Sequence, residues 1–150
     1  MSPPLTQTLH VWMRIVMQHS MRNFMLYAKE HNYSMAQLNA LFRIRQKGTC
    51  GVSDLGEEMG VTSAGASQLL ERLVQQGLAM RTEDPQDRRN KRIALTDAGQ
   101  KIIEESAAAR QSWLTQVAEL LPTDEQKQVN DALQLLIEKT TLLDKTTTEQ

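Results

Sequence analysis

The chain has little of several residue types on which whole classes of protein depend. Only one of its 150 residues is cysteine, and aromatic residues make up 4%. The single cysteine, Cys50, excludes an internal disulfide and cannot build a cysteine-rich zinc site. Because aromatic rings are so few among 40% hydrophobic residues, the core is expected to be aliphatic and rich in methionine. A chain of this length fits one domain, residues 1–150, with a core of its own.

Long apolar runs and targeting signals are also missing. No uninterrupted apolar stretch reaches membrane-spanning length, and Met1-Ser2-Pro3-Pro4 lacks the basic and apolar regions of a signal peptide. We therefore expect a soluble, cytoplasmic protein without a membrane partner.

Catalytic and metal-binding motifs are absent as well. His10, His19 and His31 are nine and twelve residues apart, so no two form the i,i+4 pair of a helical metal site. No glycine-rich phosphate loop, nucleophile elbow or pair of catalytic carboxylates stands out. The sequence therefore predicts neither an enzyme nor a bound cofactor or metal.

Charge is unevenly distributed, although the formal net charge is −1. Residues 1–96 hold 12 basic and 8 acidic side chains, whereas residues 97–150 hold 5 basic and 10 acidic ones. Such asymmetry is compatible with one end that faces nucleic acid and another that faces away. Ordinary scatter over a solvated surface would also explain it, so the distribution decides nothing alone.

Hydrophobic spacing predicts six helices and one hairpin. The first helix, about residues 5–31, has an apolar stripe wider than one face, so it should be buried on two sides. Its second cover is either another subunit or the rest of its own core. Ser34 and Gln37 form a capping-box pattern for the next helix, which Gly48 ends.

Two short helices are expected in the middle of the chain, over residues 53–59 and 63–76. Gly60-Val61-Thr62 forms the turn between them, and Gly77 stops the second one. Two short helices joined by a three-residue turn are typical of a helix-turn-helix.

The second of these helices begins with small residues, Ser63-Ala64-Gly65-Ala66-Ser67-Gln68. A glycine inside a helix costs about 1 kcal/mol relative to alanine, so Gly65 indicates that another backbone, such as DNA, comes close. Alternatively, Gly65 relieves crowding against Leu55 or a neighbouring helix. In the first case Ser63, Ser67 and Gln68 can reach base edges, with glutamine best suited to adenine. Arg72, one turn later, would meet phosphate or an internal acid.

A cationic hairpin follows. Asp84-Pro85 opens a turn between two strand-like segments, residues 78–82 and 91–95, and Arg88, Arg89 and Lys91 lie in or beside its loop. Such a hairpin is suited to contact with a phosphate backbone and groove.

Two long helices complete the chain. Thr96 is the expected N-cap of a helix that extends to about residue 121, where Pro122 breaks it. Thr123 and Gln126 give a capping-box pattern for the last helix.

Several of these segments together resemble the MarR family of winged helix-turn-helix regulators. Asp87-Arg88-Arg89, followed by Leu95-Thr96 and Gly99, resembles the family's wing signature, and the segments that match its helix-turn-helix and wing entry are Val52-Ser53-Asp54-Leu55, Gly60-Val61-Thr62 and Gln76-Gly77-Leu78. The resemblance implies a mainly α fold with a small β-hairpin wing, a winged helix-turn-helix core over about residues 34–100, and dimerisation helices over about residues 5–31 and 100–144.

The resemblance also implies a function: a homodimeric, sequence-specific regulator of transcription that binds pseudopalindromic double-stranded DNA, as a repressor released by a small aromatic or anionic effector. It places Arg89 in a minor groove, where a charge-assisted bond to the Asp87 carboxylate orients it. Arg88 and Lys91 become candidates for phosphate contacts or remain solvated. The effector would bind between the dimerisation region and the DNA-binding part, near Met13, Arg14, Met17 and His19.

Three alternatives remain open. Some relatives sense peroxide through a cysteine in the first helix, but Cys50 lies just before the helix-turn-helix and is interpreted as structural. The chain could instead be an architectural DNA binder, with a specificity ratio near one across sequences. It could also be a winged-helix protein-interaction module, which would keep its affinity after the wing is neutralised.

Overall fold

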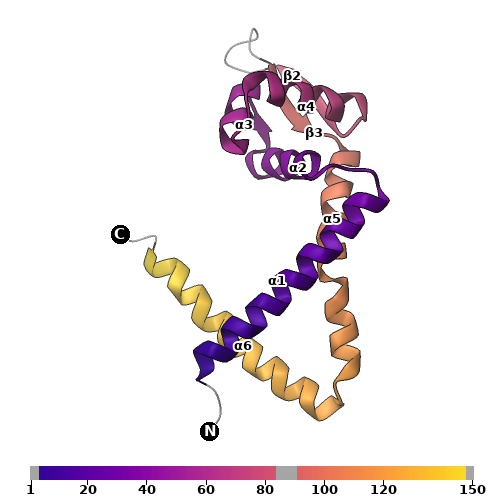
Figure 1. The fold of residues 1–150 in the computed structure, drawn as a ribbon. Coiled ribbons are helices and arrows are strands. Elements are labelled where there is room, and N and C mark those ends of the chain that lie inside the picture. The colour runs from indigo at the N-terminus through magenta and orange to yellow at the C-terminus, as the bar shows by residue number, and fades with distance from the viewer. Residues whose placement is uncertain (1–3, 84–90, 148–150) are drawn as a thin grey trace. The chain divides into compact units, whose positions relative to one another are not determined.

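The computed structural model describes residues 4–83 and 91–147, with side chains for residues 4–83 and 92–142. Within these ranges the elements are α1 (Leu5–Glu30), α2 (Met35–Lys47), β1 (Thr49–Cys50), α3 (Val52–Met59), α4 (Ser63–Gln75), β2 (Ala79–Glu83), β3 (Lys91–Leu95), α5 (Asp97–Leu120) and α6 (Thr123–Thr147) (Figure 1). The chain divides into two compact units at residue 111, within α5. The mainly helical fold class with a small sheet is confirmed, and the elements lie close to their predicted bounds.

The sheet has one more strand than the sequence predicted. Its order is β1-β3-β2, with both pairs antiparallel and Met80 opposite Ala94 in the hairpin. The extra strand, β1, has only two residues, of which Thr49 pairs with Ala94. Arg92 on β3 stabilises the pairing with β1, because its Nη2 donates to the Thr49 carbonyl oxygen at 3.1 Å.

The core of the first unit is aliphatic, as predicted, but it is not rich in methionine. Leucine and isoleucine dominate its fully buried side chains: Leu38, Leu41, Ile44, Leu55, Leu73, Ile93 and Ile103. Of the methionines that the structure describes, only Met59 packs against this core, whereas Met13, Met17, Met21, Met25, Met35 and Met80 are exposed. Methionine therefore contributes to surfaces here rather than to the interior.

Two capping predictions have opposite outcomes. The capping box of α2 is confirmed, because the Gln37 backbone N–H donates to Ser34 Oγ at 3.1 Å and the Ser34 backbone N–H donates to Gln37 Oε1 at 2.8 Å. The predicted capping box of α6 is wrong. Thr123 is already the first residue of that helix, and Gln126 Nε2 donates instead to the carbonyl oxygens of Ala118 and Leu121. Pro122 makes the difference, because its fixed φ and missing N–H place the helix start directly after it.

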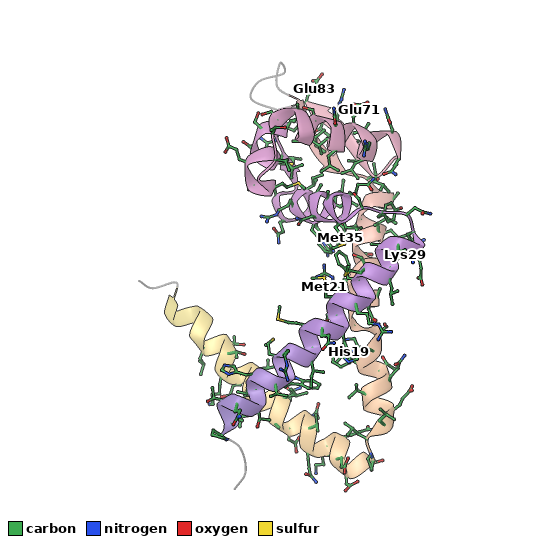
Figure 2. The ribbon with its side chains drawn as sticks, in the orientation of Figure 1. His19, Met21, Lys29, Met35, Glu71 and Glu83 are labelled. Atoms are coloured by element: carbon green, nitrogen blue, oxygen red, sulfur yellow. The ribbon has the colours of Figure 1, made fainter. Side chains whose placement is uncertain are left out.

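α1 is anchored at its C-terminal end and exposes apolar side chains along the rest. Phe24, Tyr27 and Ala28 are buried, and the Tyr27 hydroxyl donates to Glu105 Oε2 at 3.1 Å. Burial, reinforced by this carboxylate, raises the pKa of Tyr27 to about 12. By contrast Met21, which is labelled in Figure 2, is 51% exposed. No helix in the described ranges is long and apolar enough to cross a membrane.

The wing is joined to α5 by a tight backbone junction. Thr96 is the N-cap of α5, as predicted: its Oγ1 accepts from the Gly99 N–H at 3.1 Å and donates to the Gly77 carbonyl oxygen at 2.6 Å. Its own N–H donates to the Leu78 carbonyl oxygen at 3.2 Å. The start of the wing and the start of α5 are thereby held together.

Candidate nucleic-acid interface

α3 and α4 form the helix-turn-helix that the sequence predicted. Gly60 adopts a left-handed conformation with φ +65°, and the Val61 N–H then donates to the Gly56 carbonyl oxygen at 3.0 Å. The two helices pack closely, because a Cβ placed on Gly56 would lie 3.3 Å from the Cβ of Ala66. This packing fixes α4 relative to α3.

α4 is amphipathic, with a polar face directed to solvent. Its inner face buries Ala66, Leu70 and Leu73 in the core. The four side chains proposed for DNA contact lie on the other side and are all exposed: Ser63, Ser67, Gln68 and Arg72. Arg72 forms no ion pair with any residue in the described ranges. A helix with this arrangement offers hydroxyl, amide and guanidinium groups to an external partner.

The far end of α4 is attached to α2 by a pair of glutamine side chains. Gln37 Nε2 donates to Gln76 Oε1 at 2.8 Å, and Gln37 is 8% exposed. Because buried amides rarely go unsatisfied, this bond helps to fix the position at which α4 ends. The polar face of α4 therefore belongs to a helix held at both ends.

Gly65 proves to be crowded by its own helix cap. The Gly65 N–H donates to Thr62 Oγ1 at 3.1 Å, and an added Cβ would lie 3.3 Å from that oxygen and 3.8 Å from Val61 Cβ. The crowding anticipated against Leu55 is not what the structure shows. Whether the open side of Gly65 also admits DNA remains a prediction.

The wing is described only in its strands. The predicted turn, with Asp87, Arg88 and Arg89, lies outside the described residues, and so does the side chain of Lys91. Their proposed contacts with the minor groove and with phosphates remain predictions from the sequence.

Three ion pairs that the sequence did not predict connect the elements of this surface. Glu71 on α4 accepts a hydrogen bond from Nη2 of Arg81 on β2. Glu58 on α3 pairs with Lys47 and, at 3.7 Å, with Arg43, both on α2. The hydrogen bond that Lys47 Nζ donates to the Glu58 carboxylate raises the pKa of Lys47. Charges on the winged core are therefore partly neutralised before any partner binds.

A small polar pocket lies away from the α4 surface, between α2 and α5. It has a volume of about 330 Å³ and is lined by Asn39, Phe42, Arg43, Gln46 and Arg110. The Arg110 guanidinium lies over the Phe24 ring, 3.7 Å from its centroid, and 5.3 Å from that of Phe42. Burial lowers the pKa of Arg110, and its Nε has no hydrogen-bond partner among the described residues.

The residues first proposed for effector contact do not line this pocket. Met13, Arg14, Met17 and His19 are all exposed on α1, and their role remains a prediction. Arg110 could not be identified from sequence patterns, because its two aromatic neighbours come from α1 and α2.

Cys50 is fully buried, and burial raises the pKa of its thiol. A raised pKa disfavours the reactive thiolate, which supports the structural interpretation of this residue. Within the described part of the chain, no cluster of three or more His, Cys, Asp or Glu side chains could hold a metal ion.

Together, a helix-turn-helix, a following antiparallel hairpin and flanking long helices define a winged helix-turn-helix protein. Residues 33–91 match the model of the MarR family. The helix-turn-helix segment of the chain thus matches this family, as the sequence predicted.

Named relatives agree with this assignment. The HTH-type transcriptional regulator YfiV of Bacillus subtilis is 32% identical over 103 residues, which are 69% of this chain and 64% of YfiV. The HTH-type transcriptional repressor MdtR of the same species is 32% identical over 62% of this chain and 60% of its own length. The chain thus spans less than two thirds of either relative. Because both are named as regulators of transcription, they support the prediction that the chain is not an enzyme.

A solved structure extends the likeness of fold over most of the chain. A variant of MepR from S. aureus, bound to an oligodeoxyribonucleotide, has a TM-score of 0.69 and 21% identity, and covers 88% of this chain and 97% of its own.

Proposed function

We propose that the chain is a sequence-specific DNA-binding regulator of transcription, acting as a homodimer and as a repressor released by a small effector. The observation that carries this proposal is the exposed polar face of α4, on a helix whose other face is buried in the core. A helix held in this way can enter a major groove without rearrangement. The match of residues 33–91 to the MarR family, and the DNA-bound MepR with a similar fold, support it.

Dimerisation is supported by apolar surface that one chain leaves exposed. Large hydrophobic side chains on α1 and α6 are between 38% and 67% exposed, namely Leu5, Val11, Trp12, Met13, Met17, Met21, Met25, Leu26, Val129, Leu133, Leu135, Ile137 and Leu142. Extended apolar patches of this kind mark association sites. We assign them to contacts with a second copy, because a two-fold dimer would place two copies of α4 on one duplex.

Base readout by α4 is tested by Gln68→Ala. The variant should relax the preference at one base pair in each half-site, at a cost of about 1–3 kcal/mol for the preferred sequence and little for random DNA. Fluorescence anisotropy measures the affinity for a panel of duplexes that each differ from the preferred sequence by one base pair. Gln18→Ala, at an exposed glutamine on α1, is the matched control. A loss that is equal on every sequence would reassign Gln68 to a phosphate contact.

Effector release is supported by the pocket at Arg110. A partly buried guanidinium that stacks on aromatic rings and lines a pocket suits a small aromatic carboxylate. Benzoate should therefore weaken DNA binding by the wild-type chain, and Arg110→Met should require about tenfold more benzoate, since hydrogen bonds to charged groups contribute about 1.5–3 kcal/mol. The control is DNA affinity without benzoate, which should stay unchanged. Equal sensitivity in both proteins would remove this pocket from the proposal.

A further inference from the structure

The ion pair between Glu71 and Arg81 lies between the helix proposed to read bases and the first strand of the wing. Glu71 Oε2 accepts from Arg81 Nη2, and the two side chains are 46% and 51% exposed. Glu71 follows Ser67 by four residues and Gln68 by three, so it shares their side of α4. Figure 2 shows it at the same end of the winged core as Glu83, the last residue of β2.

Each charge of this pair would act on DNA if it were released. An arginine near the duplex binds phosphate whatever the base sequence, and so strengthens binding to all DNA alike. A lone carboxylate on the same surface would repel phosphate. The pair cancels both effects while it is intact.

We propose that Glu71 is a specificity-determining residue, which holds Arg81 in an ion pair and so withholds this guanidinium from the phosphates of unrelated DNA. The inference rests on the proposed DNA-binding function and adds to it. Specificity is the ratio of the affinity for the preferred sequence to the affinity for unrelated DNA. A carboxylate that keeps an arginine from binding phosphates of any sequence raises this ratio without contacting a base.

The test compares four proteins: the wild type, Glu71→Gln, Arg81→Gln and the double variant. Their affinities are measured by anisotropy for a scrambled duplex and for the sequence that the wild type enriches from random DNA, at several salt concentrations. Glu71→Gln should bind the scrambled duplex about fivefold more tightly and steepen log affinity against log salt by about 0.9 for each freed guanidinium. Its affinity for the enriched sequence should rise less, so the specificity ratio falls.

Arg81→Gln should have the opposite effect on the scrambled duplex. It leaves the Glu71 carboxylate unpaired and so weakens binding to both duplexes, and the double variant should return close to the wild-type ratio. If the two single variants change the affinity for the scrambled duplex in opposite directions, the role of the pair is electrostatic. A packing role would weaken binding in both variants. Glu138→Gln, which breaks the exposed pair with Lys139 on α6, makes the same charge change outside the winged core and should alter neither affinity.

Two results would overturn this inference alone. One is an unchanged affinity of Glu71→Gln for the scrambled duplex, while the wild type discriminates between the sequences. The other is a loss of preference at a single base pair, which would mean that Glu71 itself accepts a hydrogen bond from cytosine. A wild-type chain that binds neither duplex would overturn the proposed function and, with it, this inference.

Discussion

Gly99→Ala should destabilise the fold by about 3 kcal/mol or more, the range of severe overpacking substitutions. A Cβ at this position would lie 2.0 Å from the Leu78 carbonyl oxygen and 3.0 Å from its carbon. Neither atom can move freely, because the Leu78 oxygen accepts from Thr96 N–H and the Leu78 N–H donates to the Leu73 carbonyl oxygen at 2.9 Å. The junction between wing and α5 must therefore open.

Urea unfolding followed by circular dichroism measures the loss as a lower midpoint at unchanged slope. Gly60→Ala provides a control, because Gly60 adopts the left-handed conformation with φ +65° and has no atom within 4 Å of an added Cβ. It should cost only the strain of a left-handed alanine, about 1 kcal/mol. If Gly99→Ala unfolded within about 0.5 kcal/mol of the wild type, the junction geometry described above would be incorrect.

Ser67→Glu should abolish specific DNA binding, with a loss of at least about 100-fold, or about 2.7 kcal/mol. Ser67 is exposed on the polar face of α4, one turn after Ser63 and next to Gln68. A carboxylate there meets phosphates and base acceptors of its own sign, and like charges brought together in an interface cost several kcal/mol. Folding should be unaffected, because glutamate is a good helix former and the site is solvent-exposed.

Thermal unfolding and anisotropy separate these two effects. Ala36→Glu introduces the same charge at an exposed position on α2 and should bind DNA within about threefold of the wild type, because exposed charges apart from an interface are largely screened. Unimpaired binding by Ser67→Glu would show that α4 does not face the duplex.

Local signals account for what could be predicted from the sequence. Glycine stops, the Ser34 and Thr96 caps and the apolar spacing determine the helices almost to the residue, because each is a property of a few neighbouring positions. β1 was missed for the same reason, since two residues between Gly48 and Gly51 hold no periodic pattern.

Features that depend on tertiary structure could not be predicted. Glu71 and Arg81 are ten residues apart and meet only because β2 turns back beside α4. Arg110 reaches Phe24 and Phe42 across three helices. The exposed polar face of α4 was predictable, because the spacing of its small and polar residues relative to its leucines can be recognised in the sequence alone.

Selection of bound sequences from random duplex DNA tests the central claim most directly, with the wild-type chain and Ser67→Glu run in parallel. The wild type should enrich a pseudopalindrome whose half-sites are centred about 34–36 Å apart, one duplex turn, as a two-fold dimer requires. Ser67→Glu should enrich nothing. A wild type that binds DNA without enrichment would indicate an architectural binder, and one that binds no DNA would indicate a protein-interaction module. Either result, or the same motif from both proteins, would contradict readout by α4.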